Sequence, residues 1–201
     1  MPLVTFEGID GCGKTTQIEK LSEYLKSKGI KHSIFREPGG TKIGEQIRNI
    51  LLDKSNTSMD PKTEFLLYAA SRAQLVKEKV KPELEKGEYV ILDRYIDSSV
   101  AYQGFGRGLG KRIVMLVNEF ATDMLYPDLT FYFEIDKETF EKRMKPKKDR
   151  LESEGWLFME RVIEGYNSLK RSKRFVTVDG KLGENEIFKV IIEEFEKHFA
   201  L

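Results

Sequence analysis

Short apolar runs alternate along this chain with longer segments in which apolar residues recur every three or four positions. Four of the runs are nearly continuous, as strands buried on both faces should be, and a fifth is shorter and weaker. Strands that alternate with helices indicate an α/β domain built on a parallel sheet. We expect strands at residues 3–7, 33–36, 89–93, 129–135 and 175–178, and helices at about 14–28, 42–53, 61–80, 111–125, 137–144, 155–171 and 184–199.

Several boundaries between these segments are marked by helix-capping residues. Asp60 precedes Pro61, which reads as an N-cap followed by proline at the first helical position. Gly29 and Gly87 stand where helices commonly end in a left-handed residue. Pro82 is expected to break or restart the helix that precedes Gly87.

The strongest chemical signal is a glycine-rich segment after the first expected strand. Residues 8–15 match G-x-x-x-x-G-K-[ST] at every fixed position, between an apolar strand and a helical pattern. Such a loop turns backbone N–H groups toward a phosphate, and the following helix adds a favourable dipole. We expect Lys14 to reach the β- and γ-phosphates of ATP and the Thr15 hydroxyl to ligate Mg²⁺. The predicted ATP-binding residues are Gly8, Ile9, Asp10, Gly11, Cys12, Gly13, Lys14, Thr15 and Thr16.

A second signal is the aspartate that ends the apolar strand at residues 89–93. In P-loop proteins such an aspartate lies beside Mg²⁺, often through a water molecule. A buried strand can end in Asp by chance, but its combination with the glycine-rich loop favours a functional role for Asp93. Thr15 and Asp93 are therefore the predicted metal residues.

Composition narrows the class of protein. A chain of 201 residues fits one domain, and a net charge of +1 gives no basic field that would indicate nucleic acid. The chain has no run of about 18 uncharged apolar residues, so we expect no membrane span and no membrane partner. The single cysteine, Cys12, excludes an internal disulfide and favours a reducing, cytoplasmic location. Because a helix N-terminus can lower a thiol pKa, oxidation of Cys12 is a further hypothesis for blocking ATP binding.

The glycine-rich segment at residues 8–15 is a P-loop, and a P-loop alone does not determine which reaction a protein catalyses. A nucleotide-switch GTPase or ATPase is the alternative from another class. A GTPase would need Asn-Lys-x-Asp, and no Asn in this chain is followed by Lys. Its other marker, Asp-x-x-Gly, occurs only inside the loop, from Asp10 to Gly13. A motor ATPase would normally carry further domains.

Polar segments after the second and third strands favour a phosphoryl acceptor instead. Residues 36–41 follow the second strand, and residues 93–95 and 98–104 follow the third. Because open α/β sheets bind ligands at the carboxyl ends of their strands, these segments and the P-loop should share one cleft. Arginines that converge there suit a phosphate monoester.

Apolar side chains in the helix from Pro61 recur with helical spacing and predict the face that packs on the core. Tyr68 and Arg72 are one turn apart and roughly a quarter turn off that face, at ~100° per residue, so both can reach one ligand. From the pattern alone, a core aromatic and a surface ion pair are the simpler interpretation of these two residues. The predicted core face consists of Leu66, Ala69, Ala73, Val76 and Val80.

Taken together, these motifs resemble the thymidylate kinase family. The resemblance implies a P-loop NTPase fold of the nucleoside-monophosphate-kinase type, with a five-stranded parallel sheet of order 2-3-1-4-5 flanked by helices and a short basic lid. It implies one kinase domain over residues 1–201, usually a homodimer, that transfers the γ-phosphoryl group of ATP with Mg²⁺ to dTMP, a step of dTTP synthesis. The matching segments, in family order, are residues 8–16, 36–41, 68–72, 93–95, 98–104 and 127–130.

The resemblance also implies roles for individual residues. Tyr68 would stack on thymine, Arg72 would bond its O4, and Tyr102 would crowd the 2′ position. Arg48 and Arg94 would grip the dTMP phosphate. The adenine would lie near residues 179–182 and Arg143. The implied dTMP-binding residues are Asp10, Glu37, Arg48, Tyr68, Arg72, Arg94, Ser99, Tyr102 and Gln103.

The family supplies a catalytic arginine from the P-loop or from the lid. Because Gly11 follows Asp10 here, the cation is expected from the lid at about residues 144–154. Arg143 and Arg150 fit its edges, but lysines at 145, 147 and 148 lack the planar fork of arginine, so the contacting cation stays open. A solvated charged face is the plainer interpretation of this run. The predicted catalytic residues are Lys14, Arg94, Asp10, Arg143 and Arg150.

Neighbouring activities stay open from the sequence. A phosphate acceptor with a second pKa near 6 is already a dianion at neutral pH and needs no base. A deoxynucleoside kinase must deprotonate a neutral hydroxyl, and Glu37 could serve it; another nucleoside-monophosphate kinase is a third candidate. The helix at 111–125 is apolar enough to form either the dimer interface or core, through Ile113, Val114, Leu116, Val117 and Phe120.

Overall fold

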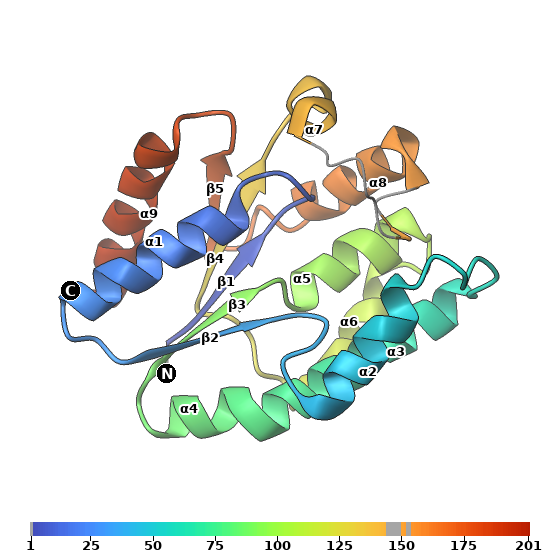
Figure 1. Ribbon diagram of the computed structural model, residues 1–201, viewed down its shortest axis with the longest axis horizontal. Coiled ribbons are helices and arrows are strands. Elements are labelled where there is room, and N and C mark those ends of the chain that lie inside the picture. Colours follow the sequence, from blue (N-terminus) through green and yellow to red (C-terminus); the bar gives the residue numbers. More distant parts are fainter. Residues whose placement is uncertain (1, 144–149, 152–153) are drawn as a thin grey trace.

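The computed structural model describes residues 2–143, 150–151 and 154–201 and contains one five-stranded parallel sheet (Figure 1). The strand order is β2-β3-β1-β4-β5, so the predicted order 2-3-1-4-5 is confirmed. Two of the five strands begin and end at the predicted residues, and the others differ by one residue at an end. The strands are β1 Leu3–Glu7, β2 His32–Arg36, β3 Tyr89–Asp93, β4 Leu129–Glu134 and β5 Phe175–Asp179.

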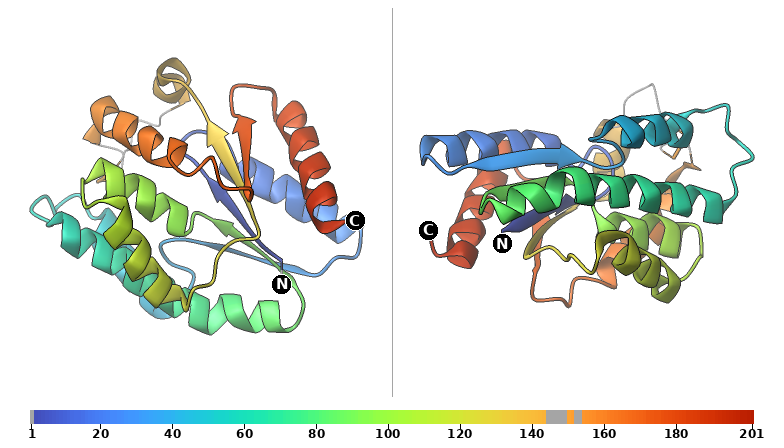
Figure 2. Two further views of the ribbon diagram at one scale, coloured as in Figure 1. Left: turned by 180° about the vertical axis from the view of Figure 1, so that it is seen from behind. Right: turned by 90° about the horizontal axis from the view of Figure 1, so that it is seen from below.

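Helices connect the strands and cover both faces of the sheet (Figure 2). α1 and α9 pack together on one face, and α8 packs against the segment η2 on the other. The segments η1 and η2 are π-helical. The helical elements are α1 Lys14–Ser27, α2 Lys42–Leu52, α3 Pro61–Leu75, η1 Val76–Val80, α4 Lys81–Glu85, α5 Ile96–Ser99, η2 Val100–Gly106, α6 Lys111–Thr122, α7 Lys137–Arg143, α8 Trp156–Asn167 and α9 Glu184–Phe199.

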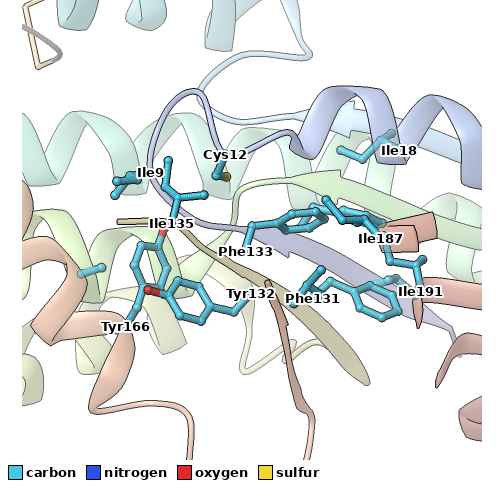
Figure 3. Close-up of a cluster of buried hydrophobic side chains, with 14 of the residues drawn as sticks. Ile9, Cys12, Ile18, Phe131, Tyr132, Phe133, Ile135, Tyr166, Ile187 and Ile191 are labelled. Atoms are coloured by element: carbon cyan, nitrogen blue, oxygen red, sulfur yellow. The ribbon is translucent and has the colours of Figure 1, made fainter. Parts of the chain in front are cut away.

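The side chains of β4 point alternately to the two faces of the sheet and pack against different helices. Phe131 and Phe133 lie toward Ile187 and Ile191 of α9, whereas the Tyr132 ring lies against Tyr166 of α8 (Figure 3). The Tyr132 and Tyr166 rings stack with centroids 4.8 Å apart. Because successive strand residues point to opposite faces, a strand covered by helices on both sides must be apolar or aromatic throughout, which explains its continuous run.

The predicted helix signals are largely confirmed. The Asp60 side chain accepts a hydrogen bond from the N–H of Lys62, with Pro61 in the first helical position. Gly29 and Gly87 have positive φ values of 69° and 80° after their helices. Pro82 stands in the first turn of α4, where a missing N–H does little harm, so it restarts the helix rather than breaking it. The helical segments α5 and η2 were not expected from the sequence.

The predicted core face of α3 is wrong in part. Leu66 is 57% exposed, whereas Phe65 and Ala69 are buried and Arg72 is only 1% exposed. The buried face therefore runs through a charged residue, because hydrogen-bond partners from other elements surround the Arg72 guanidinium. In the part of the chain that the structure describes, no helix has the length and apolar character needed to cross a bilayer.

Candidate active site

A cleft of about 500 Å³ opens at the carboxyl ends of β1, β2 and β3. The P-loop forms one side, and residues that follow β2 and β3, together with α3, form another. Its lining residues are Asp10, Gly11, Gly13, Lys14, Thr15, Thr16, Arg36, Glu37, Pro38, Arg48, Leu52, Tyr68, Arg72, Asp93, Arg94, Ser98, Ser99, Tyr102, Gln103, Arg143 and Leu151.

The P-loop backbone requires glycine at its first position. Gly8 has φ 141°, and a Cβ atom there would lie 2.6 Å from the Phe133 carbonyl oxygen and 2.9 Å from the Cys12 sulfur. The Lys14 ammonium bends back over the loop and donates to the carbonyl oxygens of Gly8 at 3.1 Å and Ile9 at 3.3 Å. The side chains of Ile9 and Cys12, themselves loop residues, are buried and belong to the apolar cluster drawn in Figure 3. The loop thus surrounds a cation with its own carbonyl groups and leaves Thr15 and Thr16 in the cleft.

The expectation of an activated thiol at Cys12 is wrong. Cys12 is fully buried, and burial raises the pKa of its thiol above the usual value. The proximity of the Lys14 ammonium, 3.6 Å from the sulfur, acts in the opposite direction but does not reverse the shift. Cys12 is therefore an inert packing residue.

Arg94 joins the P-loop to the segment after β3. Its backbone has a left-handed φ of 70°, and one guanidinium nitrogen donates to Asp10 Oδ1 at 2.7 Å. The other terminal nitrogen donates to the Gly8 carbonyl oxygen at 2.8 Å, and the guanidinium lies 5.1 Å from the Tyr102 ring centre. Burial acts to raise the pKa of Asp10, but the positive charges of Arg94 and Lys14 outweigh it and lower that pKa. Three predicted site residues, Asp10, Arg94 and Tyr102, therefore meet in the cleft.

Arg72 is held by a buried polar network. Its Nε donates to Glu37 Oε2 at 2.7 Å, and its Nη1 donates to Ser99 Oγ at 2.9 Å and Asn118 Oδ1 at 2.5 Å. Its Nη2 donates to the Tyr95 carbonyl oxygen at 3.1 Å and lies 2.6 Å from Glu37 Oε2. The interpretation of Arg72 as a surface ion pair is wrong, since both side chains of this pair are 1% to 2% exposed. The buried Arg72 guanidinium is bonded by four residues, whereas the Glu37 carboxylate bonds Arg72 through Oε2 alone.

Three buried polar atoms at the cleft have no hydrogen-bond partner among the residues that the structure describes. They are Glu37 Oε1, Asp93 Oδ1 and the Tyr102 hydroxyl. Burial raises the pKa of Glu37 despite the neighbouring charge of Arg72. Since buried polar atoms are nearly always bonded in proteins, these atoms indicate a polar ligand.

Three further residues that were predicted to bind dTMP also lie at the cleft. Arg48 and Tyr68 line the cleft, and Arg48 donates to the Pro38 carbonyl oxygen at 2.9 Å. Gln103 lines it too, with its amide donating to Glu64 Oε1 at 2.9 Å.

The two arginines at the edges of the predicted lid lie apart. Arg143 lines the cleft and donates to the carbonyl oxygens of Gly180 at 2.7 Å and Gly11 at 3.5 Å. Arg150 does not line it: its side chain donates to Glu64 Oε2 at 2.7 Å and to the Leu51 carbonyl oxygen at 2.9 Å. Most of the predicted lid, with its three lysines, lies outside the described residues.

Sequence reasoning missed several residues around the cleft. Of the further lining residues, Leu52 lies outside every segment predicted to form the site, whereas Arg36, Pro38, Ser98 and Leu151 fall inside such segments but were not named individually as site residues. Behind the lining, Glu7 and Asn118 hold other site residues in place. A carboxylate at the end of the otherwise uncharged strand β1 was a readable signal for Glu7, whereas the sequence offered none for Asn118.

Comparisons with known proteins agree over nearly the whole chain. A family model described as thymidylate kinase matches residues 6–191. The chain is 52% identical over 198 residues to the thymidylate kinase of Thermoanaerobacter sp. (strain X514), covering 97% of both chains. It is 50% identical over 198 residues to that of Caldanaerobacter subterraneus subsp. tengcongensis, covering 97% of this chain and 95% of the relative. A crystal structure of thymidylate kinase from Ehrlichia chaffeensis matches with TM-score 0.81 at 31% identity, covering 96% of this chain and 98% of that chain.

Proposed function

This chain belongs to the thymidylate kinase family and phosphorylates dTMP to dTDP with ATP, and we propose that the cleft described above holds both nucleotides. The observation that carries the proposal is the pairing of Arg94 with Asp10 directly beside the phosphate loop. This places a cation for the acceptor phosphate next to the cradle for the donor phosphates. Phosphoryl transfer needs such a meeting point, because positioning and charge stabilisation supply most of its catalysis.

The proposed chemistry places two phosphate groups in line and cancels their repulsion. Lys14 and the loop N–H groups hold the ATP phosphates, while Arg94 and Arg48 grip the dTMP phosphate. The dTMP phosphate, with a second pKa near 6, attacks as a dianion and needs no protein base. One Glu37 oxygen is bonded to the buried Arg72, which supports a role in shaping the base pocket rather than in deprotonating a nucleoside.

The proposed thymine pocket lies between Tyr68, which stacks on the base, and Arg72, which bonds its O4. Ser99 and Gln103 line the same part of the cleft. Every N–H direction of Arg72 already has a partner, so thymine O4 must share or replace one of those bonds. The buried Tyr102 hydroxyl would crowd a ribose 2′-hydroxyl and so favour deoxynucleotides.

Mg²⁺ fits the residues near the P-loop. Asp93 offers a buried oxygen that lacks a partner among the described residues, and the Thr15 hydroxyl lies in the same cleft. Mg²⁺ prefers oxygen ligands and keeps several waters while bridging substrate phosphates, so two protein contacts suffice. Asp93 and Thr15 would hold the ion, which would supply positive charge to offset the negative charge of the ATP phosphates.

A lid over residues 144–154 completes the proposed single domain. Arg143, which lies against Gly11 and Gly180, would pack on the adenine. Arg150 can reach the transferred phosphoryl group only by leaving Glu64. Closure would exclude water and limit hydrolysis of ATP.

An exposed apolar face supports a homodimer. On α6, Ile113, Leu116 and Phe120 lie on one side and are 49%, 60% and 87% exposed. Leu66 on the neighbouring α3 is 57% exposed. An apolar surface of this kind is costly in water and is covered at low cost by the same face of a second copy. The proposal includes a cytoplasmic location, in keeping with the single unpaired Cys12.

The test is ADP release from ATP and Mg²⁺ with dTMP, dUMP, dCMP, dGMP, AMP and thymidine as separate acceptors. The proposal expects a strong preference for dTMP. Turnover of thymidine in place of dTMP would make this a nucleoside kinase and recast Glu37 as a base. ADP release at a rate that does not depend on the acceptor would instead support the nucleotide-switch GTPase or ATPase alternative.

A further inference from the structure

Glu7, the last residue of β1, is fully buried directly before the P-loop and has no part in the chemistry above. Its Oε1 accepts a hydrogen bond from the backbone N–H of Tyr95 at 2.7 Å. Its Oε2 accepts from the Ser98 hydroxyl at 2.5 Å and from the Tyr166 hydroxyl at 2.9 Å. Glu7 thus connects β1 with α5 and α8 at the base of the cleft.

The same two hydroxyls also contact Arg94. Its Nη1 lies within donor distance of Ser98 Oγ at 3.3 Å and Tyr166 Oη at 3.5 Å. A guanidinium can only donate, so the hydroxyls accept from Arg94 and must direct their own hydrogens elsewhere. The acceptor for those hydrogens is Glu7 Oε2, and the order of donors therefore runs from Arg94 through the hydroxyls to Glu7.

Glu7 also constrains the Arg94 backbone. Arg94 has φ 70°, a conformation that a residue with a side chain rarely adopts. The bond from Tyr95 N–H to Glu7 fixes the next peptide unit, and Arg94 N–H donates to the Phe6 carbonyl oxygen at 3.0 Å. Glu7 consequently helps to hold Arg94 at both its backbone and its guanidinium.

We propose that Glu7 is a positioning residue for the reaction: through Tyr95, Ser98 and Tyr166 it fixes the Arg94 guanidinium where it meets the acceptor phosphate. The inference rests on the proposed function, which assigns Arg94 to that phosphate. Glu7 would touch neither nucleotide, because it is fully buried and is not among the residues that line the cleft.

The electrostatic setting of Glu7 supports a role beyond packing. Burial, with repulsion from Asp97, raises the pKa of Glu7 to about 7, against the opposing effects of Ser98, Arg94 and Tyr166. An apolar side chain would avoid this cost. A buried carboxyl that the fold retains at a cost beside a cleft is more often functional than structural.

Glu7→Gln, assayed at about pH 8 where a carboxyl with a pKa of about 7 is mostly ionised, is the sharpest test because it keeps size while changing donor order. If the amide oxygen faces Tyr95 N–H, the amide nitrogen points its hydrogens at the Ser98 and Tyr166 hydroxyls, whose own hydrogens then lose the acceptor that Glu7 Oε2 provides. If the amide is reversed, its nitrogen meets the Tyr95 N–H. In either orientation Arg94 loses its fixed position.

The expected result is a fall of about 10- to 100-fold in kcat/KM for dTMP, the size of effect that misplacement of a binding group produces. The KM for ATP should stay within about 2-fold, because Lys14 and the loop N–H groups do not depend on Glu7. The matched control is Thr5→Val, on the same strand as Glu7, which removes a fully buried hydrogen bond to Thr130 of β4. Its kinetic constants should equal those of the unmodified protein.

A second variant keeps the test decisive if Glu7→Gln does not fold. Tyr166→Phe removes one hydroxyl while its ring can still stack on Tyr132, and it should lower kcat/KM for dTMP by about 3- to 10-fold. Added to Glu7→Gln, it should cost less than it does alone, because both act on Arg94.

Two results would overturn the inference while leaving the proposed function intact. One is an unchanged kcat/KM for dTMP in Glu7→Gln, or in Tyr166→Phe if the first variant does not fold. The other is a loss that affects ATP and dTMP equally and follows the fraction of folded protein. Failure of the unmodified protein to use dTMP at all would instead refute the proposed function.

Discussion

The two sides of the cleft are formed by different kinds of group, backbone on one side and side chains on the other. The proposed donor side is mostly backbone: a continuous loop of residues 8–15 in which glycines take positive φ values and Lys14 bonds the loop carbonyls. The proposed acceptor side is a set of side chains from separate elements, with Arg72 of α3 bonded to Glu37 after β2 and Asn118 of α6. A backbone cradle depends on local sequence, whereas a side-chain network depends on the whole fold. Mutations on the two sides should therefore differ in how much they lower the free energy of unfolding and how much they lower activity.

The largest expected effect is on the acceptor side, from Arg72→Met. The change leaves Glu37 buried without its cation, and breaking a buried pair in this way costs about 3–5 kcal/mol. We expect a large fall in the free energy of unfolding together with loss of dTMP binding, measured by chemical denaturation and calorimetric titration. Arg36→Met is the matched control, since its pair with Glu45 is 49% and 42% exposed, and exposed pairs contribute little. Equal losses from both changes would contradict the contrast.

On the donor side, Lys14→Ala should separate function from stability. Removing one charged group that stabilises the transferring phosphate should lower kcat by roughly 10²- to 10³-fold. The free energy of unfolding should fall less than in Arg72→Met, because no buried carboxylate is left unpaired. Lys20→Ala on the same helix, where the ammonium bonds Asn185, should retain activity. A Lys14→Ala protein that unfolds before it loses activity would refute this account of the loop.

A smaller expected effect is that the free energy of unfolding depends on pH through Glu7, a residue at the boundary between the two sides of the cleft. The pKa of Glu7 in the folded protein is raised from 4.5 to about 7. A raised pKa means that Glu7 favours the folded state most at pH values below 4.5, and that this contribution is lost as the pH rises through about 7. At ~1.4 kcal/mol per pKa unit the loss is about 3 kcal/mol.

Glu7→Gln lacks this titration and supplies the comparison. Its free energy of unfolding relative to the unmodified protein should improve by roughly 2 to 3 kcal/mol between about pH 5 and about pH 8. Denaturation of both proteins at the two pH values measures the shift. A difference that stays constant would mean that Glu7 does not titrate in this window.

The features that were predicted correctly are those that depend on residues close together in the sequence. The P-loop and the bounds of β1 and β3 needed only a motif and continuous apolar runs. The helical segment at residues 96–106 was missed because its serines and glycines interrupt any apolar period. These residues are nonetheless mostly buried, and contacts with α6 and α8 hold them in helical form.

The burial of Arg72 could not be predicted from its own helix. A charged residue on the core face contradicts the helical pattern unless its partners are known, and those partners lie 23 to 46 residues away in the sequence. Ser99 and Glu37 were named by resemblance to a family, but their bonds to Arg72 follow only from the packing of α5 and the segment after β2 against α3.

The central claim is that Arg94 serves the acceptor and Lys14 the donor, although both lie beside Gly8. Calorimetric titration of Arg94→Lys with dTMP and, separately, with a non-hydrolysable ATP analogue and Mg²⁺ tests it most directly. Lysine keeps a charge near Asp10, but its donors all sit on one nitrogen and cannot reproduce the separate bonds that the two terminal nitrogens of Arg94 make to Gly8 and Asp10. We predict about 10-fold weaker dTMP binding, the size of one charged hydrogen bond, with unchanged affinity for the analogue. Weaker binding of the analogue with unchanged dTMP affinity would contradict the account.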